Sequence, residues 1–212
     1  RVRVLYEPRE NFRANFTAQI FDEDRNGAAQ KGLLDPTPNA RELRQDSRAD
    51  YELTSELYSV VLEWDLEAFS IKSLTSYQND DVLINRDNDR NDLAVLAPFA
   101  QLPSVYVPET NKQKTVTQEI NLISGDPLFG KMDWVAGVFY LNTEVEISIR
   151  ELLDFNFNGT FDPFTLDQVF AFDDDAEIGF ISDSKPERDS TSIYGQGTWN
   201  FNDEWRAVFG LR

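Results

Sequence analysis

The sequence contains no cysteine and no histidine. Without these residue types the segment cannot form a disulfide, use a thiol nucleophile, build a histidine metal site or complete a serine–histidine triad. It also has no apolar run near the roughly 20 residues that a transmembrane helix needs, and no signal-peptide pattern at its start. The first residues already have the pattern of a strand, as do the last, so we expect an internal fragment of a longer protein.

Positive charge is also scarce. The chain has 38 acidic against 20 basic residues, which gives a formal net charge of −18. A field of this sign repels nucleic acid and anionic lipid headgroups, so we expect no nucleic-acid partner. The simplest interpretation is a solvated acidic loop surface, although such a field also suits cations.

The apolar content is modest, at 41% hydrophobic, but 13% of the residues are aromatic. That aromatic content is too high for a disordered chain. We therefore expect a folded protein whose apolar residues are spread over many strands rather than pooled in one core.

Residues 115–150 have the strongest pattern in the chain. They predict two long β-strands joined by a tight Gly-Asp-Pro turn, with apolar and polar residues alternating along the second strand. The apolar set of this second strand is nearly complete at the odd positions Phe139, Leu141, Thr143, Val145, Ile147 and Ile149. The even positions are all polar: Asn142, Glu144, Glu146, Ser148 and Arg150.

The same hairpin plan repeats along the chain. We expect about eight strands in four hairpins, at residues 1–21, 52–78, 115–150 and 190–212. Short turns lie within the hairpins, whereas polar, turn-rich connections of about 22–50, 80–112 and 151–188 lie between them. Short turns at one end and long loops at the other are typical of transmembrane barrels. The predicted fold is all-β, an antiparallel up-and-down transmembrane β-barrel segment.

The tryptophans agree with this prediction. Trp64, Trp134, Trp199 and Trp205 all lie beside predicted short turns. If those turns share one membrane interface, the indoles form part of an aromatic girdle, with the ring in lipid and the N–H toward the headgroups.

Several strands resemble TonB-dependent outer-membrane receptors. Residues 117–124, TQEINLIS, and 133–140, DWVAGVFY, resemble that family's "TQELRL-S … W-x-G-x-F-Y" segment. Residues 70–77, SIKSLTSY, resemble its "L-x-S-x-T-S-Y" strand, while 192–198 and 210–212 resemble "S-x-A-x-F-G-Q" and "G-L-R-Y". Two departures stand out: Tyr194 replaces a frequent Ala or Phe, and Asn121 replaces a frequent Arg.

This resemblance implies a fold, a location and partners. The family's fold is a 22-stranded barrel occluded by an N-terminal plug. Its members import ferric siderophores, cobalamin or glycans across the Gram-negative outer membrane with energy passed through TonB. Residues 1–212 would then be part of the barrel domain, without the plug, the TonB box or the remaining strands. The implied partners are outer-membrane lipid, the TonB complex and a small-molecule ligand such as a ferric siderophore.

No catalytic, cofactor-binding or metal-binding residue is predicted, and the resemblance implies a transporter rather than an enzyme. The matching motifs are scaffold, so no ligand-binding residue carries over. Carboxylates are abundant by composition, and no pair stands out as an acid/base couple.

Two stretches start like a calcium loop, at 22–27 (DEDRNG) and 154–159 (DFNFNG). Both lack the closing Glu at position 12 of the motif, where Leu33 and Thr165 stand, although Asp162 offers the second stretch an oxygen. Ordinary Asx/Gly turns are the better interpretation.

The third long connection contains an acidic run at 173–175 with Glu177 nearby, which we interpret as solvated. It is also rich in phenylalanine, for which we favour packing over ligand contact. These residues are Phe155, Phe157, Phe161, Phe164, Phe170 and Phe172.

Two alternatives remain open at this stage. A passive porin-like channel has the same strand pattern, and a secreted all-β carbohydrate-binding module has similar alternation. A barrel turns its apolar side chains outward around its circumference, whereas a sandwich buries them between two sheets.

Overall fold

The computed structural model describes residues 1–212 except 28–29, 40, 46–48, 92–103 and 155–176. The described residues form one antiparallel sheet of nine strands. The strands are β1 (Val2–Arg9), β2 (Phe12–Asn26), β3 (Asp50–Asp65), β4 (Phe69–Asp87), β5 (Ser104–Ser124), β6 (Met132–Asp154), β7 (Glu177–Ser184), β8 (Glu187–Asn200) and β9 (Arg206–Leu211).

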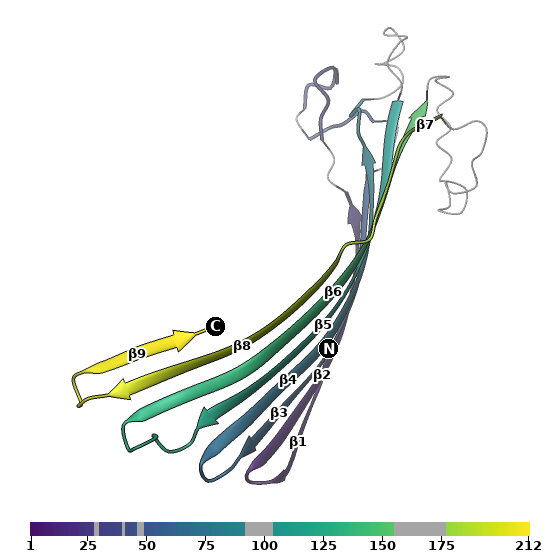
Figure 1. Cartoon of the computed structure of the whole chain (residues 1–212). Helices are drawn as coiled ribbons and strands as arrows, with labels where there is room; N and C mark the ends of the chain where they lie inside the picture. The colour runs from purple at the N-terminus through teal and green to yellow at the C-terminus, as the bar shows by residue number, and fades with distance from the viewer. Residues whose placement is uncertain (28–29, 40, 46–48, 92–103, 155–176) are drawn as a thin grey trace.

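The strands follow one another in the sheet in the order of the sequence, as an up-and-down barrel wall requires. Figure 1 shows the short turns together at one end of a long, curved sheet. β6 pairs with two strands in succession: with β8 along residues 132–144 and with β7 along residues 147–153. β7 and β8 therefore occupy one position in the sheet, interrupted at Lys185-Pro186.

One face of the sheet, here called the tryptophan face, carries Trp64, Trp134 and Trp199. Strand pairing places a set of mainly apolar side chains beside them, interrupted by Ser73, Thr75 and Gln118, since facing residues of neighbouring strands point to the same side. This set includes Val4, Ala14, Phe16, Val60, Leu62, Ile71, Leu122, Ile120, Ala136, Val138 and Ile193. Many of these side chains are exposed, so the face needs an apolar environment outside the chain.

The apolar band ends abruptly on each strand. On β2 it runs from Phe12 to Ile20, close to the about 9–11 residues of a transmembrane strand, and Asp22 follows on the same face. On β3 the last apolar residue is Tyr58, whose ring stacks on Tyr77 with 6.5 Å between centroids. The band therefore has tryptophans at its short-turn end and tyrosines at its other end, as an aromatic girdle requires.

The sheet is open in the described structure. β1 and β9 are the two edge strands, each with one partner. The described residues include no helix that is long and apolar enough to span a membrane.

Two sequence-based expectations need correction. The strands extend further than predicted: β2 continues to Asn26, β4 to Asp87, and β5 begins at Ser104, so part of each predicted long loop is strand. The apolar odd positions of residues 139–149 also lie on the opposite face, because the tryptophan face of β6 carries the even positions. Beyond the band the polarity of the two faces is reversed, so the alternation alone does not identify the lipid-facing side.

Candidate functional site

The face opposite the tryptophans carries rows of charged and polar side chains at the level of the apolar band, with apolar residues such as Val61, Leu74 and Phe139 between them. Arg13 Nε lies 2.7 Å from Glu7 Oε1, and Arg13 Nη1 lies 3.3 Å from Glu63 Oε2. Glu63 also accepts from Lys72 Nζ at 2.8 Å. These four side chains link β1, β2, β3 and β4 in one chain of ion pairs. On the same register row follow Asn121, Gly137 and Tyr194, which carry the polar row across β5, β6 and β8.

Tyr194 completes this row by reaching over β6. Its hydroxyl lies 2.5 Å from Glu119 Oε1 and from Asn121 Oδ1, both on β5. Gly137 makes this possible, because a Cβ there would lie 2.6 Å from Tyr194 Cζ and from Asn121 Oδ1. Asn121 Nδ2 in turn donates to Glu119 Oε1 at 2.9 Å. The Glu119 carboxylate therefore has two neutral donors and is satisfied without a cation in contact.

A second row, made of hydroxyl groups, lies further toward the long connections on the same face. The row between the two contains Asn15, Val61, Leu74, Glu119 and Phe139. Facing positions across β2, β3, β4 and β5 are occupied by Thr17, Ser59, Ser76 and Thr117. The Ser76 and Thr117 hydroxyls are hydrogen-bonded to each other. The opposite face thus offers a row of small polar groups, whereas the tryptophan face at this level is mostly apolar, with Thr75 and Gln118 among its polar residues.

A cavity of about 350 Å³ follows beyond the hydroxyl row. Its chemistry is dominated by side-chain amides around one carboxylate, Asp80, which accepts from Ser55 Oγ at 2.6 Å and Gln78 Nε2 at 2.8 Å. The lining residues are Gln19, Phe21, Leu53, Ser55, Gln78, Asp80, Val82, Asn111 and Gln113. The volume lies in the range of small-molecule pockets.

The tryptophan face becomes charged beyond the apolar band. Lys112 Nζ lies 3.7 Å from Asp81 Oδ2, and Lys185 Nζ lies 2.7 Å from Glu146 Oε1. The hydrogen bond from Lys185 lowers the pKa of Glu146, and the fork of hydrogen bonds from Arg150 lowers the pKa of Asp183. The Lys112–Asp81 and Lys185–Glu146 pairs are solvent-exposed, so each contributes little to stability, whereas Arg150 is buried.

The first calcium-like stretch is not a loop. Residues 22–26 belong to β2, with Asp22, Asp24 and Asn26 alternating on the face that pairs with Thr54, Glu52 and Asp50 of β3. An extended strand holds these oxygens apart along one line, and so they cannot close around an ion. No group of three or more acidic side chains that could hold a metal occurs among the described residues.

The second calcium-like stretch lies almost wholly outside the described residues, beginning at the end of β6. The acidic run at 173–175 and the phenylalanines at 155–172 also lie outside them, and the Glu177 side chain is not described. The predictions about these residues stay predictions.

An apolar band with aromatic borders on one face and a polar wall on the other defines a segment of a transmembrane β-barrel. The model of one protein family, described as TonB dependent receptor-like, beta-barrel, matches residues 5–212. The chain belongs to this family. None of the curated proteins matches it.

Family membership fixes the environment of the two faces. The family consists of outer-membrane transporters of Gram-negative bacteria, so the tryptophan face contacts lipid and the opposite face lines the interior of the barrel. The alternative of a secreted all-β carbohydrate-binding module does not hold, because the chain belongs to a barrel family and the described strands form a single sheet with an exposed apolar band.

The sequence analysis missed the residues of the cavity. Asp80 and Asn111 fall within the predicted loop of about 80–112, and Gln113 directly follows it, whereas all three lie in strands. The signal that was present is the odd-position run Asn111, Gln113, Thr115, Thr117 and Glu119, which is polar throughout and continues one face of a strand.

Proposed function

We propose that this chain forms part of the barrel wall of a receptor that imports a scarce ligand across the outer membrane by energy-coupled transport. The observation that carries the proposal is the pairing of a lipid-facing apolar band with a polar interior wall in a chain of this family. In such a receptor the ligand is of the ferric-siderophore, cobalamin or glycan type, the energy arrives through TonB, and no reaction is catalysed.

The proposal includes parts of the protein that are not in this sequence. We propose that residues 1–212 are one piece of a barrel domain and that a plug and a TonB box precede it in the full protein. The coding sequence upstream tests this directly. A plug-sized segment of about 120–150 residues, within the usual size of a domain, supports the proposal.

The competing function is a passive porin-like channel, which the polar interior wall would serve equally well. Energy dependence separates the two. Uptake of the receptor's ligand is measured in cells with and without a functional TonB protein. Loss of uptake in the second strain supports import by the energised route, whereas unchanged uptake leaves a passive barrel.

A further inference from the structure

The cavity on the interior wall lies between the hydroxyl row and the outer ends of β2, β3, β4 and β5. It is therefore on the side of the long connections, where a ligand arriving from outside meets the wall before it reaches the ionic row. Its position makes it a candidate first contact, and its lining tells which chemistry it accepts.

Primary amides dominate the polar lining. Gln19, Gln78, Asn111 and Gln113 each offer two N–H donors and one carbonyl acceptor. Asn111 Oδ1 has almost no exposed surface and no hydrogen-bond partner in the structure. An unpaired buried amide oxygen of this kind is unfavourable, and a change of the Asn111 rotamer can turn it toward the cavity that the residue lines. A donor supplied by a ligand removes that cost.

The charge of the lining excludes an anionic partner. None of the side chains lining the cavity, all of them within the described residues, is a lysine or an arginine, and the one charged group is the Asp80 carboxylate. The arginines further along the same wall are engaged with carboxylates: Arg25 Nε lies 3.3 Å from Glu23, and Arg86 Nη2 lies 2.8 Å from Glu109. A polyanionic metal chelate would be desolvated here against a like charge and without a counter-ion.

The apolar part of the lining suits a ring with a hydrophobic face. Phe21 is 46% exposed and stands at the border of the cavity, and Leu53 and Val82 are half-buried beside it. A lining that combines apolar side chains with amides matches a ligand that has both hydroxyls and C–H groups.

We propose that this cavity binds an uncharged, polyhydroxylated ligand of the neutral-oligosaccharide type. The proposal rests on the import function above, since it names the ligand class of that barrel. The amides bind ring hydroxyls, Asp80 accepts from one of them, and Phe21 packs on the sugar face. Among the ligand types of the import hypothesis, this chemistry favours a glycan over an anionic ferric chelate.

The test uses the full-length receptor purified in detergent and isothermal titration calorimetry. The neutral probes are maltohexaose, cellohexaose and xylohexaose, and the anionic probe is ferric citrate. Gln113→Leu removes a cavity amide. Gln118→Leu removes the same group from the tryptophan face of the same strand and is the matched control. Gln19→Leu is a second cavity variant, used if Gln113→Leu fails to fold.

We expect at least one oligosaccharide to bind and the cavity variant to weaken it roughly tenfold or more, with no change for Gln118→Leu. Binding of ferric citrate alone, binding of none of the three oligosaccharides, or equal effects of the two variants would overturn the assignment. Uptake of the bound oligosaccharide with and without TonB then tests the import function separately. If an oligosaccharide binds but its uptake does not depend on TonB, the proposed ligand class is supported and the proposed energy-coupled transport is contradicted.

Discussion

The Tyr194 hydroxyl lies 2.5 Å from Asn121 Oδ1, although a whole strand separates β8 from β5. Both residues are among the departures from the motifs that the sequence resembles. Here they contact each other across Gly137, where the missing side chain leaves room for the tyrosine ring. Two departures that look independent in sequence form one interaction on the interior wall.

Removing the hydroxyl tests the strength of this interaction. Tyr194→Phe retains the ring over Gly137 but takes a donor from Glu119, leaving a carboxylate with fewer partners. We expect the free energy of unfolding to fall by about 1–2 kcal/mol. Urea unfolding of the full-length receptor, followed by heat-modifiable migration on gels, measures this. Tyr58→Phe, which removes a hydroxyl at the lipid boundary, is the control, and an equal loss there would contradict the prediction.

A side chain at Gly137 should be costly for a specific steric reason. In Gly137→Ala the new Cβ meets Tyr194 Cζ and Asn121 Oδ1 at 2.6 Å, so the ring must move. We expect a loss of about 1–3 kcal/mol, typical of overpacking. In a Tyr194→Ala background the same substitution should cost far less, because the ring is gone. A double-mutant cycle measures the coupling, and strictly additive effects would show that the ring does not limit this position.

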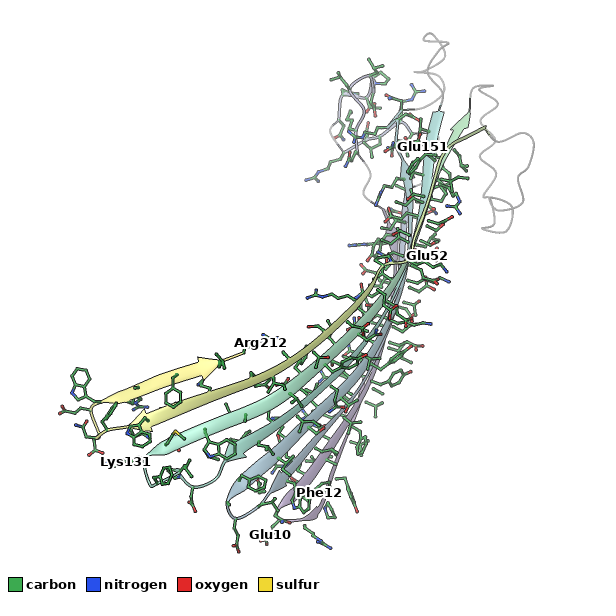
Figure 2. All side chains as sticks on the ribbon, in the orientation of Figure 1. Glu10, Phe12, Glu52, Lys131, Glu151 and Arg212 are labelled. Atoms are coloured by element: carbon green, nitrogen blue, oxygen red, sulfur yellow. The ribbon has the colours of Figure 1, made fainter. Side chains whose placement is uncertain are left out.

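Glu63 should act as the shared acceptor of the ionic row. Glu63→Gln leaves Arg13 and Lys72 facing each other with one neutral group between them. Since all three side chains are partly exposed, we expect a modest loss of about 0.5–1 kcal/mol that shrinks at high salt. The measurement is the urea midpoint at low and high salt. Glu10→Gln, the same charge change at the β1–β2 turn (Figure 2), should have no such salt-dependent effect.

The connection between β2 and β3 contains a pH-sensitive turn. The Thr37 hydroxyl and amide donate to Asp35 Oδ1, and the Arg44 amide donates to Oδ2, which together lower the pKa of Asp35 to about 2. Because the pKa of Asp35 is lower in the folded turn than in the unfolded chain, where it is about 3.9, the ionised side chain stabilises the turn at pH values above about 3.9. This stabilisation is lost as the pH falls toward about 2.

Pepsin cleavage at Leu33, which is fully exposed, reports on this turn. We expect slow cleavage at pH 4 that accelerates toward pH 2, normalised to a free peptide of residues 30–45. Asp35→Asn imitates the protonated side chain and should be cleaved quickly at both pH values. A variant that stays resistant at pH 4 would show that the carboxylate does not hold the turn.

The strand pattern was predictable because each hairpin alternates clearly inside the apolar band. Residues 58–64 and 193–201, for example, place one face in lipid, and the register follows from the short turns. Tryptophan positions were equally informative, since the residues beside the turns do lie at the border of the band.

The outer halves of the strands were not predictable in the same way. Beyond Tyr77, at the outer border of the apolar band, the tryptophan face of β4 carries the polar residues Asn79 and Asp81. The interior face carries the apolar residues Val82 and Ile84. The polar and apolar residues therefore change faces partway along the strand. A strand with one face in lipid throughout would keep the same alternation, and so this segment resembles a polar loop in sequence. The stretch at 22–27 was interpreted as a turn although most of it is strand, because carboxylates at alternate positions fit a strand as well as a turn.

Contacts across several strands depend on register, which sequence spacing does not give. Strand pairing brings together the side chains of Asn121 and Tyr194, which form a hydrogen bond. It also brings together the side chains that line the amide cavity on β2, β3, β4 and β5. In Figure 2, Phe12 and Lys131 lie at the short-turn end of the sheet, and Glu52 and Glu151 lie toward the other end.

The most direct test of the account asks which face of the sheet meets lipid. The sequence has no cysteine, so single cysteines can be introduced along residues 57–62 of β3 in the full-length receptor and spin-labelled. We predict that labels at Tyr58, Val60 and Leu62 collide with oxygen dissolved in the bilayer, whereas those at Leu57, Ser59 and Val61 do not. The opposite alternation, or equal oxygen accessibility at all six positions, would contradict the assignment of the tryptophan face to lipid.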